Sequence, residues 1–154
     1  MIQRIQTLYL LLAAICVGAT FMLPLMQYSD GIAEYTLRGY MISDGMSSST
    51  RPVIYLAILL GISALVPFVT IFLFKRRMLQ IRLCVAEIVL LAGSIIMTAI
   101  YCWLAYRSVA EAPFGAGSVK VWVCLPLVAL IFTVLAVKAI FRDELLIRSL
   151  NRIR

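Results

Sequence analysis

Four long apolar stretches alternate with short charged segments along the 154-residue chain. The stretches 5–29 and 52–74 carry no charged residue, and the two that follow carry one each, Glu87 and Lys138. A helix of about 20 apolar residues crosses a hydrocarbon core roughly 30 Å thick. The pattern therefore predicts four transmembrane helices, at approximately 5–26, 52–74, 83–106 and 120–141.

The expected fold class is all-α, a four-transmembrane-helix bundle that forms a single membrane domain over residues 1–154. Hydrophobic residues make up 64% of the chain and the mean hydropathy is +1.04, far above a soluble domain. Beyond the helices the pattern leaves only segments too short to bury a soluble core, namely the N-terminal tip, loops 27–51 and 107–119, turn 75–82 and tail 142–154.

The basic residues divide unequally between the two sides of this bundle. Counted on alternate sides of successive helices, ten of the fourteen Lys and Arg residues share one side with both termini, and four lie on the other: Arg38, Arg51, Arg107 and Lys120. The positive-inside rule then predicts cytoplasmic termini, a cytoplasmic turn 75–82 and outward loops 27–51 and 107–119. Basic residues at a membrane surface also attract anionic lipid headgroups, so the net charge of +7 requires no nucleic acid partner.

Loop 27–51 is the longest polar segment. Two Ser-Asp-Gly turns, at 29–31 and 43–45, flank residues 32–42, whose content is typical of a strand. We expect a short extended segment or small hairpin lying over the bundle. The preferred interpretation of the loop is a connector, with a docking surface as the alternative.

Charged residues at bilayer depth are costly and commonly face the bundle interior. Glu87 falls on one narrow face of its helix with small and polar residues, Ser94, Thr98, Cys102 and Ala105. Such a face packs against a neighbouring helix through hydrogen bonds or lines a polar path, and we favour packing. Lys138 pairs with Glu87 or extends to the headgroups, so the candidate intramembrane polar site is Glu87, Ser94, Thr98 and Lys138.

Other residue types argue against familiar membrane chemistry. The four cysteines, Cys16, Cys84, Cys102 and Cys124, form no Cys-x-x-Cys pair, and the chain has no histidine to ligate haem or metal. We expect no cofactor, no metal and no enzymatic activity. Aromatic residues near the outward helix ends predict an interfacial belt, made of Tyr28, Tyr55, Tyr101, Trp103, Tyr106 and Trp122.

The two ends of the chain, MIQRIQTLYLLL at 1–12 and RDELLIRSLNRIR at 142–154, together resemble a family of small four-helix inner-membrane proteins of unknown function from Bacteroidota. The resemblance implies a multi-pass protein of a bacterial inner membrane and no activity. It makes the terminal segments a candidate cytoplasmic interaction surface, comprising Gln3, Arg4, Gln6, Asp143, Glu144, Arg148, Ser149 and Arg152.

We expect the two terminal segments to meet, with Arg4 opposite Asp143 or Glu144. The predicted function is a non-enzymatic accessory or assembly subunit that binds a partner protein in the lipid bilayer. The alternative is a small transporter or channel subunit that uses the polar face of the third span, as a homo-oligomer.

Overall fold

The computed structural model describes residues 2–29, 33–45, 50–73, 77–110 and 115–151. Its four long helices match the four predicted spans in order and number, and each is long and apolar enough to cross a membrane. The chain is therefore a multi-pass membrane protein. The helices are α1 (Ile2–Met22), α2 (Ile54–Phe72), α3 (Arg77–Ala110) and α4 (Leu125–Asn151).

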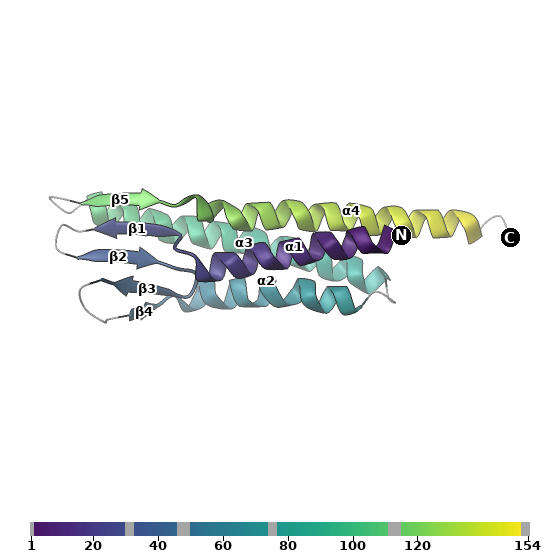
Figure 1. Ribbon diagram of the computed structural model, residues 1–154, viewed down its shortest axis with the longest axis horizontal. Helices are drawn as coiled ribbons and strands as arrows, with labels where there is room; N and C mark the ends of the chain where they lie inside the picture. The colour runs from purple at the N-terminus through teal and green to yellow at the C-terminus, as the bar shows by residue number, and fades with distance from the viewer. Residues whose placement is uncertain (1, 30–32, 46–49, 74–76, 111–114, 152–154) are drawn as a thin grey trace.

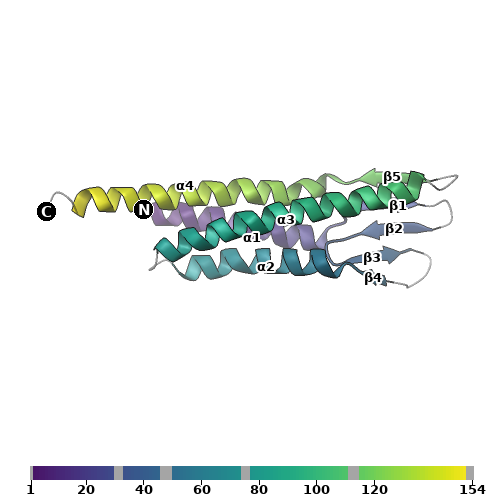
Figure 2. The same ribbon diagram turned by 180° about the vertical axis from the view of Figure 1, so that it is seen from behind.

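The helices form an antiparallel ring in which each packs against the next along the chain and α4 returns to α1 (Figure 1). Both ends of the chain lie at the same end of this bundle (Figures 1 and 2). A small sheet extends from the opposite end, and its strands run roughly along the bundle axis.

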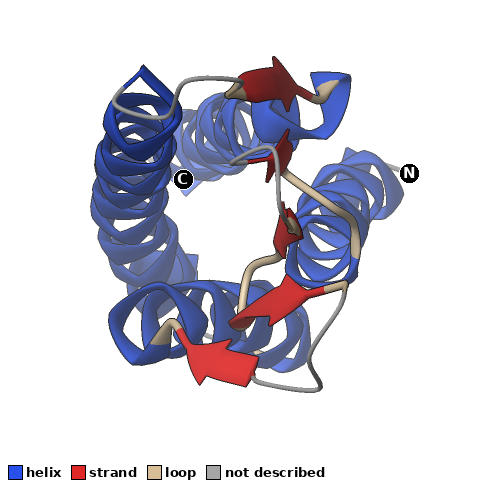
Figure 3. Ribbon diagram, turned by 90° about the vertical axis from the view of Figure 1, so that its left-hand side faces the viewer, coloured by secondary structure: helices blue, strands red, loops and turns tan. Residues whose placement is uncertain are grey.

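The predicted all-α fold class is wrong in one respect, because the structure also contains a small sheet. It has five antiparallel strands in the order β4-β3-β2-β1-β5. Seen along the bundle axis, the strands form a curved row across the end of the ring of helices (Figure 3). The strands are β1 (Met26–Ser29), β2 (Glu34–Leu37), β3 (Met41–Asp44), β4 (Thr50–Pro52) and β5 (Ala116–Val119).

The expected hairpin exists as β2 and β3, whereas sequence analysis missed the other three strands, β1, β4 and β5. β4 crosses the boundary between the predicted loop 27–51 and the predicted span 52–74. Met26 continues the apolar run of the first span, so the predicted helix ends at residue 26 and the rest of β1 falls in the predicted loop 27–51. The helix ends instead at Met22, since Pro24 disfavours helical backbone in the residue before it. β5 lies in the predicted loop 107–119, and its Ala-Gly-Ser-Val sequence has little strand character.

The observed helix bounds also differ from the predicted ones at both ends of the bundle. α3 begins at Arg77, so most of the predicted turn 75–82 is helical, and α3 runs on to Ala110, where it packs against β1 and β5. The tail continues α4 to Asn151 without a bend into a separate helix. A short 3-10 turn, η1 (Val121–Cys124), precedes α4.

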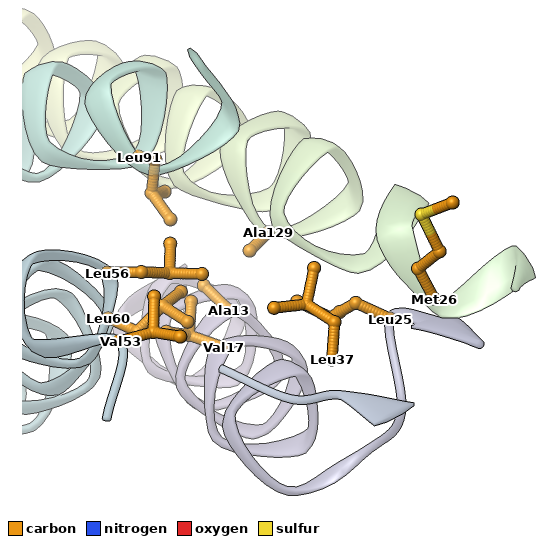
Figure 4. Packing of buried hydrophobic residues seen from close by; sticks show 10 residues of the cluster. All are labelled: Ala13, Val17, Leu25, Met26, Leu37, Val53, Leu56, Leu60, Leu91 and Ala129. Atoms are coloured by element: carbon orange, nitrogen blue, oxygen red, sulfur yellow. The ribbon is translucent and has the colours of Figure 1, made fainter. Parts of the chain in front are cut away.

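The main hydrophobic core joins the bundle to the sheet. It draws Ala13 and Val17 from α1, Leu56 and Leu60 from α2, Leu91 from α3 and Ala129 from α4. Figure 4 shows how Leu25, Met26 and Leu37, at the base of the sheet, continue this cluster beyond the helices. The sheet is thus part of the same folded unit as the bundle.

The turn between β2 and β3 is seated directly on the bundle. A Cβ atom at Gly39 would lie 2.9 Å from the Phe21 backbone and 2.9 Å from a methyl carbon of Leu60. The ring of Tyr40 stacks on Phe21, with centroids 5.1 Å apart. Glycine is required here because α1 approaches too closely for any side chain.

Candidate functional site

Polar side chains gather inside the bundle. Glu87, Ser94 and Thr98 of the predicted stripe are all buried on α3, and Glu87 is only 1% exposed. Buried hydroxyls from the other helices join them, namely Thr20, Ser63, Thr70 and Thr133. The part of the stripe nearer the sheet is less enclosed, since Cys102 and Ala105 are half-buried against the core. The stripe prediction correctly gave the orientation of Glu87 toward protein.

The carboxyl group of Glu87 has no hydrogen-bond partner among the described residues, and both of its oxygens are buried. Lys138, the partner considered from the sequence, is exposed on α4. The structure therefore does not form a Glu87–Lys138 pair. Lys138 lies one turn from Arg142, a position from which its side chain reaches the headgroups.

The buried hydroxyls bond within their own helices. Thr98 Oγ1 donates to the Ser94 carbonyl at 2.7 Å, and Ser94 Oγ donates to the Leu91 carbonyl at 2.8 Å. The same pattern holds for Thr20, Ser63, Thr70 and Thr133. The expected hydrogen bonds between helices are thus replaced, at these six hydroxyls, by bonds to carbonyls three or four residues earlier.

Glu87 lies near the middle of the bundle. A Cβ atom at Gly93 of α3 would contact Leu59 of α2 at 3.5 Å, which fixes the register of these antiparallel helices. Moving six residues along α3 to Glu87 corresponds to moving six along α2, to about Leu65. The central residue of α2 is Ser63, so Glu87 lies within roughly 3 Å of that level at a rise of about 1.5 Å per residue.

The two terminal segments meet through Gln6 and Asp143. Gln6 Nε2 donates to Asp143 Oδ2 at 2.5 Å, and both side chains are nearly buried between α1 and α4. Asp143 Oδ1 has no partner among the described residues. The expected contact between the termini therefore exists, with Gln6 as its donor.

The structure describes the other residues of the predicted terminal surface only in part. Glu144 is half-buried and takes part in an interaction. The side chains of Gln3, Arg4, Arg148 and Ser149, and the whole of Arg152, lie outside the described part of the structure. The predicted contact of Arg4 with Asp143 or Glu144 falls on those residues.

The sheet has two chemically distinct faces. Met26 and Leu37 pair across strands and are buried toward the bundle, and Tyr28 stacks on Tyr35 on the same face. The residues between them point to the other face. This outer face is polar and includes Gln27, Ser29, Glu34, Thr36 and Ser118.

A shallow depression of about 280 Å³ lies over three strands, β1, β2 and β5. All nine of its lining residues belong to the sheet, among them the five polar residues of the outer face. None of the described residues of α3, which packs against the inner face, lines it. The other four lining residues are Tyr28, Tyr35, Ala116 and Gly117. Sequence analysis missed the depression because it depends on β5, which comes from a separate loop.

The predicted aromatic belt is present in part. Tyr55, Trp103, Tyr106 and Trp122 are exposed, and Arg107 lies over the Trp103 ring at 5.2 Å. Tyr28 and Tyr101 instead pack against the core. Across the described residues, no three His, Cys, Asp or Glu side chains come together in a way that could hold a metal ion.

A family model described as a domain of unknown function (DUF4293) matches residues 2–153. A comparison with curated proteins finds no match. The family match covers the bundle and the sheet together. It assigns no activity to any residue, and the functional argument rests on the geometry above.

Proposed function

Because the chain belongs to the DUF4293 family, a domain of unknown function, we propose a role from its geometry: an accessory or assembly subunit that binds a partner protein. The observation that carries the proposal is the open edge of the sheet at β5. The described residues hold no catalytic arrangement on which to base a reaction, and we propose a non-enzymatic role.

β5 is unprotected for an edge strand. It pairs with β1 on one side only, and all four of its residues are exposed. Natural sheets commonly protect such edges with charged residues or proline, because unpaired backbone groups accept another strand. The opposite edge strand, β4, ends in Pro52, but β5 contains neither a charge nor a proline.

A second copy of the chain is a poor match for this edge. The strands run roughly along the bundle axis, and copies in one membrane share their orientation. A two-fold axis along the membrane normal would place identical groups of the two β5 strands at the same height, N–H facing N–H. A ladder needs N–H opposite C=O, so a strand from a different protein fits better.

The polar depression beside β5 supports the same role. A strand added at β5 would extend the sheet next to Ser118, Gln27 and Thr36, which offer hydroxyl and amide groups on the outer face. Interfaces of non-obligate complexes commonly combine such polar contacts with main-chain pairing.

We propose further that the sheet faces away from the cytoplasm and that both termini are cytoplasmic. The support is the ten-to-four division of basic residues, together with the position of the sheet at the end opposite the termini. The resemblance of the terminal sequences supports a bacterial inner membrane. The Gln6–Asp143 contact joins the termini into one surface, a second place where a partner could bind.

Site-specific photocrosslinking in cells tests the accessory role. A photoreactive amino acid at Ala116 or Val119 of β5 should give one defined adduct with a foreign protein. The same amino acid at Ile62, exposed on the helical surface of α2, is the matched control and should not give that adduct. Adducts only between copies of the chain, or no adduct from either β5 position, would contradict the proposal.

A second candidate, a small transporter or channel subunit, is favoured by the buried carboxyl of Glu87 near mid-bundle. Ionisable groups at this depth often line ion pathways. The purified protein in liposomes should then conduct an ion flux. Glu87→Gln should abolish this flux, and Asp143→Asn should leave it unchanged. A homo-oligomer without a foreign partner would favour this candidate over the accessory role.

A further inference from the structure

We propose that Glu87 is a proton-binding site inside the bundle, a property independent of the accessory role. The side chain is 1% exposed, and neither carboxyl oxygen has a hydrogen-bond partner among the described residues. An ionised carboxylate without a partner is very unfavourable in a buried, apolar site. A bound cation such as a proton neutralises this charge.

The buried Ser and Thr hydroxyls of the helices donate no hydrogen bond to Glu87. Each of the six buried Ser and Thr hydroxyls in the helices uses its single proton on a carbonyl of its own helix. Their remaining lone pairs can only accept a hydrogen bond. A carboxylate at Glu87 would therefore keep an uncompensated charge, whereas a carboxyl group that carries its own proton is neutral.

Among the described side chains of the surrounding helices, no charged group provides Glu87 with a counter-ion. On α3 the neighbour of Glu87 is the Cys84 thiol, one turn away. α1 presents Tyr9 and Cys16, which pack against the two hydrophobic clusters. The only titratable residue of α2 is Tyr55 at its outward end, and Lys138 of α4 is exposed.

A proton fits the site better than a metal ion does. Magnesium and calcium take six or more oxygen ligands, usually from several carboxylates and carbonyls. The described residues contain no group of three or more acidic or other metal-ligating side chains. A proton needs only one oxygen lone pair, which Glu87 supplies alone.

Infrared spectroscopy of the full chain in lipid bilayers, with all glutamates labelled by ¹³C at the side-chain carboxyl, tests the proposal. The technique separates the carbonyl stretch of a protonated carboxyl from the stretch of a carboxylate. The chain has only four glutamates, Glu34, Glu87, Glu111 and Glu144. At neutral pH we expect one labelled protonated-acid band, lost in Glu87→Gln.

A complementary variant covers the case in which Glu87→Gln fails to fold. Replacing the other three glutamates with Gln leaves Glu87 as the only labelled group, and the protonated-acid band should persist. The proposal is overturned by a wild-type spectrum with carboxylate bands alone, or by a protonated-acid band that survives in folded Glu87→Gln. Conversion of the band to carboxylate on adding Na⁺ or K⁺ would assign a metal cation in place of the proton.

Discussion

The bundle and the sheet distribute polar and apolar side chains in opposite ways. In the bundle, large apolar residues such as Ile62 and Val89 are exposed, while Glu87, Ser94 and Thr133 are buried. In the sheet, Met26 and Leu37 are buried and Gln27 is exposed. Each region matches a different surrounding medium, lipid for the bundle and water for the sheet. We infer that the membrane boundary lies between them.

A charge placed on each surface would test this comparison most strongly. Ile62 is 46% exposed near the centre of α2, and Ile62→Arg should cost about 2.5–3.5 kcal/mol of membrane insertion. Gln27→Arg, on the outer face of the sheet, is the matched control and should leave insertion unchanged. Protein abundance in the membrane fraction measures both. Equal tolerance at the two positions would mean that both regions face water.

The junction of the two regions can be tested at Gly39. Gly39→Ala forces a Cβ atom against the Phe21 backbone, which cannot move aside as a side-chain end can, and should cost about 1–3 kcal/mol. Gly61→Ala on α2 is the control, because a Cβ atom there meets nothing within 4 Å. Unfolding of the purified protein in mixed micelles gives both values. If Gly39→Ala is as stable as Gly61→Ala, the sheet is not seated on α1 as described.

Two buried acids inside the bundle differ in their partners and should respond differently. Gln6→Leu leaves Asp143 without its donor and should cost about 1–3 kcal/mol. Adding Asp143→Leu to this variant should restore part of the loss, because no unpaired polar group then remains. A double-mutant cycle by unfolding in mixed micelles measures the coupling. Strict additivity of the two changes would argue that the contact contributes nothing.

The smallest effect is expected at Glu87. Its carboxyl has no partner to lose, so Glu87→Leu should cause no loss of stability, or a small gain. Leu91→Ala, at a fully buried position one turn away, should by contrast cost about 2–5 kcal/mol. The same unfolding assay compares them. A marked loss in Glu87→Leu would mean that the carboxyl makes a stabilising contact.

The sequence was most informative where the surrounding medium, lipid or water, determines which residue types are stable. Long apolar runs with at most one charged residue, such as those around Ile62 and Val89, are stable in lipid and not in water, so the number and order of helices followed directly. The stripe containing Glu87 and Ser94 gave the inward orientation, because helical spacing needs no knowledge of neighbours. Both inferences rest on local pattern alone.

Features that depend on distant contacts were harder to predict. β5 pairs with β1, and the sequence Ala116-Gly117-Ser118-Val119 by itself does not predict a strand. The predicted span 83–106 places Glu87 near one end of its helix. α3 in fact continues beyond the bundle to Ala110, so the register with α2 gives the better measure of depth.

Cysteine labelling in intact cells tests the central claim that the sheet and the termini lie on opposite sides of a membrane. In a background without the four native cysteines, an impermeant thiol reagent should label Glu34→Cys, at an exposed position of β2, in intact cells. Ser149→Cys, near the end of α4, should be labelled only after permeabilisation. Labelling of Ser149→Cys with protection of Glu34→Cys, or labelling of both in intact cells, would contradict the account.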